Sequence, residues 1–356
     1  MATSSTALRV GASIACAATL SLAACSDTMI TPPARSVSDG GASLTQNPDI
    51  LSANGPRFFH TKQWHDNDNA ANGKGHGGGG GGGGIPSNGI SYHGGPVLQA
   101  GTRVVAIYWA SSPIYVGGPT PGTHGAGSAD GSLVGYFLGH LGGSTYFNIN
   151  STYTDGSARP IVNSVTYTGY WANNANVPAD GANVTDAQML AMLSSGFTSG
   201  ALTYDSQTLY AIFTAGTVNL GGGFGTQYCA YHWNGNVSTP SGSRNALYAA
   251  MPYDHAYPGA CDVIGGSAAN GSFDPGADAE VNTLGHETEE TTTDPFGTAW
   301  FDSRGFENAD KCAWTFGSTY TSSAGGVANM KIGTKDFLVQ QNWVNANGGG
   351  CSTHWP

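Results

Sequence analysis

Residues 102–109 read TRVVAIYW, a continuous apolar run that is rich in β-branched and aromatic side chains. Such a run predicts a buried strand. Residues 209–214 (LYAIFT) and 247–251 (LYAAM) have the same character, and residues 337–339 predict a late strand. These runs are the expected strands of one central sheet.

Helical patterns lie between these strands. Residues 132–141 carry apolar side chains spaced by four, which predicts a helix with one buried stripe. Thr185 and Gln188 have capping-box spacing, and the helix after them is expected to end at Gly196. Because strands and helices intermix, we predict an α+β fold, a mixed β-sheet flanked by helices, with α/β as the alternative.

The N-terminal part of the chain predicts export. Residues 1–24 carry one basic residue, Arg9, and an apolar stretch rich in small residues that ends just before Cys25. This pattern predicts a signal peptide with a lipobox, so that Cys25 is a candidate lipid anchor; ordinary secretion is the alternative. The protein is therefore expected outside the cytoplasm, either secreted or anchored at the cell envelope.

A polar segment separates the signal from the expected domain. Residues 25–90 have few periodic apolar residues and contain eight consecutive glycines at 77–84. We predict a disordered tether over this range and assign no chemistry to its histidines. Residues 91–356 are expected to form one globular domain, which is long enough to bury a substantial core.

Four cysteines remain in the expected domain, and their spacing excludes a C-x-x-C motif. In an oxidising compartment four cysteines allow three pairings, which the sequence leaves open. We predict the pairs Cys229 with Cys261 and Cys312 with Cys351, because each pair joins neighbours along the chain.

The balance of charges limits the partners. Lys and Arg total 12 against 23 Asp and Glu, which gives a net charge of −11. Such a charge argues against a nucleic-acid partner, and it leaves a lipid at Cys25 as the expected contact with a membrane.

The segment with the most chemical information is 278–295, which reads DAEVNTLGHETEETTTDP. On a helix, His286 and Glu290 point the same way and can share one cation. Glu287, between them, is then placed to take a proton from a metal-bound water, as in H-E-x-x-H zinc hydrolases. The predicted fold therefore includes a zincin-like active-site helix, amphipathic at its start.

Charge crowding in this segment also indicates a cation. Glu287, Glu289 and Glu290 share one turn near the C-terminal end of the predicted helix, where the helix dipole disfavours negative charge by about 0.3–1 kcal/mol each. No Lys or Arg occurs between Arg244 and Arg304. A bound divalent cation would offset this repulsion, whereas a solvated acidic helix end is the alternative.

A third ligand is expected downstream, because catalytic zinc usually has three protein ligands. Glu307 has a long side chain and lies 17 residues after Glu290. Asp294 lies too far along the helix from His286, and Asp302 is expected to cap a turn. We therefore predict zinc bound by His286, Glu290 and Glu307, with Glu287 as the catalytic base; another divalent cation is the alternative, since carboxylates also suit calcium and manganese.

Several blocks of the chain resemble the Exordium or phosphate-induced protein 1 family: residues 95–98 (GPVL), 229–232 (CAYH), 286–290 (HETEE) with 293–295 (TDP), 299–300 (AW), 307–312 (ENADKC) and 337–340 (FLVQ). The HETEE segment with the later E-x-x-D-x-C pattern is the specific part. The resemblance implies export, a shared fold and the cysteine positions. Plant members are extracellular proteins tied to growth, and the long tether and lipobox of this chain depart from that pattern.

Two classes of function fit these observations. The first is a secreted zinc-dependent hydrolase that acts on a peptide or a cell-surface polymer, with a peptidase as the leading candidate. The alternative is a non-catalytic extracellular or cell-surface interaction protein of the Exordium type, with an aromatic face for saccharides. For His232 there are two interpretations, a residue that lines the cleft and a packed core histidine, and we prefer the second.

Overall fold

The computed structural model describes residues 55–72, 89–263, 269–271 and 274–356. The predicted signal peptide, Cys25 and the glycine run 77–84 lie outside these residues. Within the described part of the chain, no helix has the length and apolar character that crossing a membrane requires.

A seven-stranded mixed sheet forms the centre of the fold, with the strand order β1-β7-β8-β6-β3-β5-β4. β3 is parallel to β5 and β6, and β6 is parallel to β8, whereas β1, β7 and β4 pair in the antiparallel sense. The strands are β1 (Arg57–His60), β3 (Thr102–Trp109), β4 (His124–Ala126), β5 (Val165–Trp171), β6 (Thr208–Thr214), β7 (Tyr228–Thr239) and β8 (Gly242–Met251). The predicted mixed sheet flanked by helices is confirmed.

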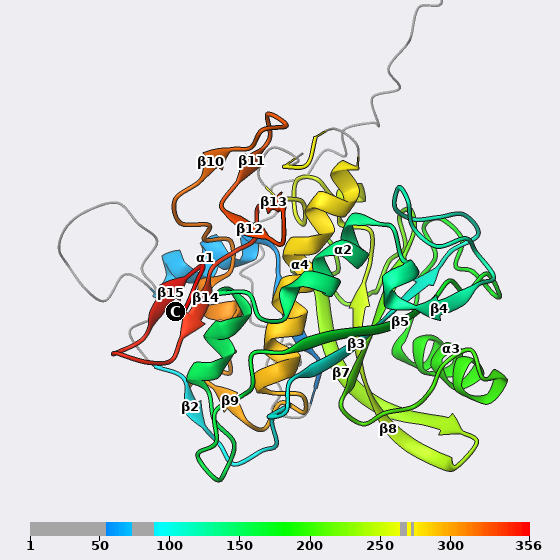
Figure 1. The fold of residues 1–356 in the computed structure, drawn as a ribbon, viewed down its shortest axis with the longest axis horizontal. Coiled ribbons are helices and arrows are strands. Elements are labelled where there is room, and N and C mark those ends of the chain that lie inside the picture. Colours follow the sequence, from blue (N-terminus) through cyan, green and yellow to red (C-terminus); the bar gives the residue numbers. More distant parts are fainter. Residues whose placement is uncertain (1–54, 73–88, 264–268, 272–273) are drawn as a thin grey trace, which may run out of the picture. The chain divides into compact units, whose positions relative to one another are not determined.

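Helices cover both faces of this sheet (Figure 1). α2 (Leu133–Leu141) and α4 (Pro275–Thr293) share one hydrophobic core with Val104, Ala106 and Tyr108 of β3. α3 (Asp186–Ser199) packs in a second core with Ile107 and Trp109 of the same strand. Because successive side chains of a strand point to opposite faces, one continuous apolar run contributes side chains to both cores.

α3 begins where the sequence predicts and ends later. The Thr185 hydroxyl accepts from the Gln188 backbone N–H, and the Gln188 side chain accepts from Thr185 in return. The predicted end at Gly196 is wrong, because the helix continues to Ser199 and Gly200 forms the left-handed C-cap. Gly196 is a packing glycine, since a Cβ there would lie 2.6 Å from Trp171.

Short elements complete the chain. β2 (Ser91–Tyr92) pairs with β9 (Trp300–Phe301), and the C-terminal part forms three hairpins outside the large sheet. The predicted late strand at 337–339 overlaps β13 at Phe337 alone, since Leu338 and Val339 lie outside the strands. The hairpin strands are β10 (Tyr320–Thr321), β11 (Val327–Ala328), β12 (Met330–Ile332), β13 (Lys335–Phe337), β14 (Asn342–Val344) and β15 (Gly350–Ser352). The 3₁₀ helices are η2 (Gly127–Ala129), η3 (Phe147–Thr152), η4 (Asp254–Ala256) and η5 (Asp310–Cys312).

Part of the predicted tether is folded. β1 joins the large sheet beside β7, and α1 (Lys62–Asn72) comes directly after it. Both belong to the same unit as the rest of the described chain, Gln46–Pro356. The prediction of a disordered tether is therefore wrong for residues 57–72, because Phe59 is fully buried and anchors this segment in the core.

α4 is buried on all sides, in contrast to the amphipathic helix that the sequence predicts. Asp274 caps its N-terminus by accepting from the Ala277 backbone N–H at 3.0 Å, and Pro275 occupies the first turn. Every residue from Gly276 to Thr293 is buried, since the helix lies against the sheet, α2 and the C-terminal segments. Its polar residues must therefore find partners inside the protein.

The two predicted disulfides are confirmed, with Cys229 bonded to Cys261 and Cys312 bonded to Cys351. The first ties β7 to the loop before α4, and the second ties η5 to β15. Two disulfides indicate an oxidising environment such as the cell exterior.

Replacing Cys312 and Cys351 with alanine is expected to lower the free energy of unfolding by about 2–5 kcal/mol, because the unfolded chain regains the freedom of a long closed loop. Denaturant unfolding of the oxidised double variant measures this change. An unchanged midpoint would mean that the hairpin of β14 and β15 fixes η5 without the bond.

Candidate metal centre

Six titratable side chains from three separate segments meet beside the sheet. α4 contributes three of them, β7 contributes one, and the segment that leads into η5 contributes two. We call this group the His–Glu cluster; it consists of His232, His286, Glu287, Glu290, Glu307 and Asp310. All are buried, and only Asp310 reaches 9% exposure. Buried carboxylates at this density require protons, donors or cations.

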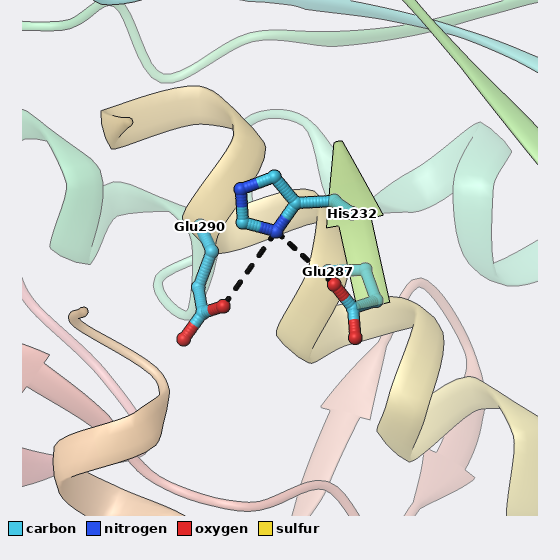
Figure 2. A group of neighbouring side chains, drawn as sticks. All are labelled: His232, Glu287 and Glu290. Carbon is cyan, nitrogen blue, oxygen red and sulfur yellow. Dashed lines mark hydrogen bonds and ion pairs between the residues drawn. The ribbon is translucent and has the colours of Figure 1, made fainter. Parts of the chain in front are cut away.

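His232 presents its Nδ1 atom to two carboxylates (Figure 2). Its Nδ1 lies 3.2 Å from Glu287 Oε2 and 3.7 Å from Glu290 Oε2. Its Nε2 lies 3.4 Å from the backbone oxygen of Asp294, which can only accept a hydrogen bond. With Nε2 as the donor to this oxygen, Nδ1 keeps a lone pair, and the Glu287 carboxyl, whose pKa burial raises, supplies the proton of the 3.2 Å hydrogen bond. Burial lowers the pKa of His232 to about 4, so the ring is neutral and suited to bind a metal.

His286 is oriented differently. The Gln340 Nε2 atom donates to the backbone oxygen of Ala309 at 2.9 Å and lies 3.0 Å from His286 Nδ1. Because an amide nitrogen can only donate hydrogen bonds, His286 Nδ1 is the acceptor, and the ring carries its proton at Nε2. His286 Nε2 lies 3.1 Å from Glu290 Oε1. This tautomer has no lone pair at Nε2 for a metal.

The two oxygens of Glu290 have different surroundings. Oε1 accepts from the Asp310 backbone N–H at 2.9 Å and lies next to His286. Oε2 has no hydrogen-bond partner among the described residues and faces His232. Burial alone would raise the pKa of Glu290, but the neighbouring His286 and the Asp310 N–H hold it below its ordinary value. Glu290 is thus an ionised carboxylate with one oxygen free.

Two triads of ligand atoms lie close enough to hold a metal ion, and both include Glu290. One adds His232 and Glu287; the other adds His286 and Asp310. The atoms of each triad lie within 4.8 Å of one another. The ring tautomers favour the first triad, because only His232 turns an unprotonated nitrogen toward its two carboxylates.

The structure brings together only part of the predicted site. His286 and Glu290 are neighbours, as the spacing of four predicts. Glu307 belongs to neither triad, since its Oε2 lies 3.7 Å from the far nitrogen of His232, Nε2. Glu287, the predicted base, lies next to His232 Nδ1, where a ligand is expected.

Burial raises the pKa of Glu287 and of Glu307, and the nearby Glu290 carboxylate raises both further. Glu287 Oε1 and both oxygens of Glu307 have no hydrogen-bond partner of standard geometry among the described residues. These atoms, together with Glu290 Oε2, form an unusual concentration of unsatisfied buried acceptors. A bound cation would satisfy several of them at once.

The other acidic residues near the cluster have structural partners. Asp294 accepts from the backbone N–H groups of Thr298 and Ala299 and so stabilises the turn after α4. Asp302 accepts from two backbone N–H groups of its own loop and pairs with Lys311 Nζ at 3.1 Å. The prediction that Asp302 caps a turn is confirmed.

Two members of this region are not indicated by local sequence patterns. His232 is a ligand candidate where the sequence suggests a packed core residue, and Arg57 belongs to the predicted tether. The Arg57 guanidinium approaches Glu307, with 3.9 Å between Nε and Oε1, and so supplies the positive charge that is absent from residues 245–303. The two adjacent phenylalanines of RFFH, within a polar segment, are a signal for β1.

A family model named the phosphate-induced protein 1 conserved region matches residues 142–342, more than half of the chain. The chain belongs to this family. Searches of curated proteins and of solved structures gave no match. In this phosphate-induced protein 1 chain, the matched region contains the whole His–Glu cluster, from His232 to Asp310, whereas Arg57 lies outside it.

Proposed function

We propose that this chain is a zinc-dependent hydrolase of the cell exterior in which His232, Glu287 and Glu290 bind the metal. The observation that carries the proposal is the convergence of three atoms, His232 Nδ1, Glu287 Oε2 and Glu290 Oε2, on one buried point. Three protein ligands with a fourth position left over is the arrangement of catalytic zinc sites.

The donor set, one imidazole nitrogen and two carboxylate oxygens, fits zinc, and manganese accepts the same kinds of atom. Zinc accepts imidazole nitrogen and carboxylate oxygen, whereas calcium takes six or more oxygens. The protein also supplies the outer partners that metal ligands need. The Asp294 carbonyl fixes the His232 ring, and the Asp310 N–H fixes Glu290.

Zinc in this position would lower the pKa of a bound water toward about 7 and polarise a substrate carbonyl. Glu307 is the carboxylate of the His–Glu cluster that belongs to neither candidate ligand triad and accepts no hydrogen bond from a described backbone N–H. Its Oε2 lies 3.7 Å from His232 Nε2, the other nitrogen of the ring that binds the metal through Nδ1 in this proposal. We assign to it the proton transfer that the sequence alone assigns to Glu287.

A second candidate function is a structural ion in a non-catalytic interaction protein. The burial of the cluster favours this alternative, because a catalytic metal must reach its substrate. The two candidates differ in what they predict for turnover, and they agree that metal is bound.

Metal analysis of the oxidised full chain, purified without chelators, tests the metal binding that both candidate functions predict. We expect about one equivalent of zinc and a higher melting temperature with zinc than after dialysis against a chelator. Incubation with denatured proteins, followed by mass spectrometry of new peptide ends with and without chelator, separates hydrolase from structural ion. Protein that binds no zinc, manganese or calcium would refute both.

A further inference from the structure

β1 lies at the edge of the sheet, directly over the His–Glu cluster. Its register places Arg57 opposite His232 and Phe59 opposite Ala230 on β7. Without β1, β7 would be the edge strand, and its backbone would offer unpaired N–H and C=O groups to another chain. His232, a proposed metal ligand, lies on that strand.

Two side chains of β1 reach toward the cluster. The Phe59 ring is fully buried, lies 4.3 Å from the His286 ring between centroids, and stacks on Trp314 at 5.0 Å. Arg57 Nη2 donates to the Gly297 backbone oxygen at 2.6 Å, and its Nε approaches Glu307. The two residues alternate along the strand, so both point to the same face.

The next positions are also held by specific contacts. Phe58 packs on the opposite face against Tyr228, with 4.5 Å between ring centroids. His60 comes after a shift in register, stacks on Trp64 at 3.6 Å, and its Nδ1 lies 3.1 Å from the Gln227 backbone oxygen. Each side chain of this four-residue strand therefore contacts the rest of the protein; we call the β1 site formed by β7, Gly297, Glu307, Trp314 and His286 the groove.

Chain connectivity makes β1 unlike the other strands of the sheet. Residues 73–88 join its segment to the rest of the chain, and eight consecutive glycines stand at 77–84. β1 pairs with one strand, β7, as β4 at the opposite edge pairs with β5 alone. An edge strand of four residues can leave without breaking the pairing of the remaining six. This is how a peptide that adds a strand to a sheet is bound and released.

We propose that the edge of β7 is a binding site for an extended peptide with a basic residue and, two positions later, an aromatic one, and that β1 occupies this site as an internal ligand. The groove offers Glu307 to the basic side chain, a pocket between Trp314 and His286 to the aromatic one, and β7 to the backbone. The proposal names the substrate class of the proposed hydrolase, and it rests on that function for the cleavage of a bound peptide. It also accounts for the burial of the cluster, because β1 covers it.

The test uses the full chain with the recognition sequence of a site-specific protease in place of residues 77–84. After cutting, a fluorescent synthetic peptide of residues 55–72 is added in excess, and its exchange into the protein is followed by anisotropy. We expect saturable binding that a Phe59→Ala peptide weakens at least about 100-fold, because a buried aromatic is lost. A Gln63→Ala peptide changes an exposed position and is expected to bind within about twofold of the parent.

A second measurement uses the intact chain. Hydrogen exchange of the β1 amides is expected to be at least about tenfold faster than that of the central strand β6, because β1 opens locally. Equal exchange rates in the two strands, loss of the fold on cutting, or failure of the labelled peptide to exchange would each overturn the proposal. If the peptide exchanges in protein that binds no metal, the peptide-binding proposal stands and the proposed zinc-dependent hydrolase activity is refuted.

Discussion

Replacing Glu287 with Gln is expected to empty the metal site. Glu287 Oε2 lies 3.2 Å from His232 Nδ1, where a shared ion would contact both atoms. A neutral amide is a much weaker ligand than a carboxylate, and two protein ligands would remain. Losing even an outer partner of a metal ligand costs about 10–100-fold in affinity, so we expect more than about 100-fold here. Zinc content after gel filtration and competition with a chromogenic chelator measure the loss.

Glu289→Gln is the matched control for this change. Glu289 lies two positions further along α4 and is equally buried, but its Oε2 accepts from Asn342 Nδ2 at 2.6 Å on another side of the helix. This variant is expected to keep its zinc. If Glu287→Gln also keeps one equivalent while turnover disappears, Glu287 is the general base, as its position in H-E-x-x-E predicts.

The surroundings of the three glutamates on one turn of α4 differ from those that the sequence predicts. Three glutamates on one turn predict repulsion that a single cation offsets. In the structure the three side chains have separate partners: Glu287 faces His232, Glu289 faces Asn342, and Glu290 faces His286 and the Asp310 N–H. Repulsion on α4 is therefore partly relieved by the protein, and the case for a metal depends on the unsatisfied oxygens instead.

The strands that carry strong local signals can be predicted from the sequence. The apolar run of β3 predicts its bounds without error, and that of β6 does so within one residue. β7 escapes prediction because its residues, YCAYHWNGNVST, mix polar and glycine positions with aromatic ones. It forms because β8 comes after a tight turn and pairs with it over most of its length. Pairing of this kind is set by tertiary context, which local patterns do not record.

The same distinction explains the predicted site. His286, Glu287 and Glu290 lie on one helix, so their spacing alone places them together. His232 and Arg57 reach the cluster through strand pairing across 175 positions of the chain, as the register Arg57↔His232 records. No periodicity in either segment could indicate this contact. Local patterns therefore predict the helix side of the site and not the sheet side.

Replacing Glu307 with Gln is expected to leave zinc bound and to abolish turnover. Gln keeps the size of the side chain, so the packing against His232 and Arg57 is preserved. The carboxylate lies outside both triads of candidate ligand atoms, which is why metal content should stay near one equivalent. Loss of a general base lowers the rate by about 10²–10⁴-fold. Zinc analysis and the chelator-sensitive cleavage of denatured proteins are measured on the same preparation.

The comparison variant is Asp302→Asn, which changes an acid of the same segment that pairs with Lys311 and not with the cluster. It is expected to keep both zinc and activity, although with lower stability, because Lys311 is buried. If instead Glu307→Gln loses its zinc and Asp302→Asn does not, Glu307 is a metal ligand, as its spacing from Glu290 predicts. In the predicted set of His286, Glu290 and Glu307, the His286 ring would have to offer the metal an unprotonated nitrogen, which contradicts the tautomer argument that selects His232.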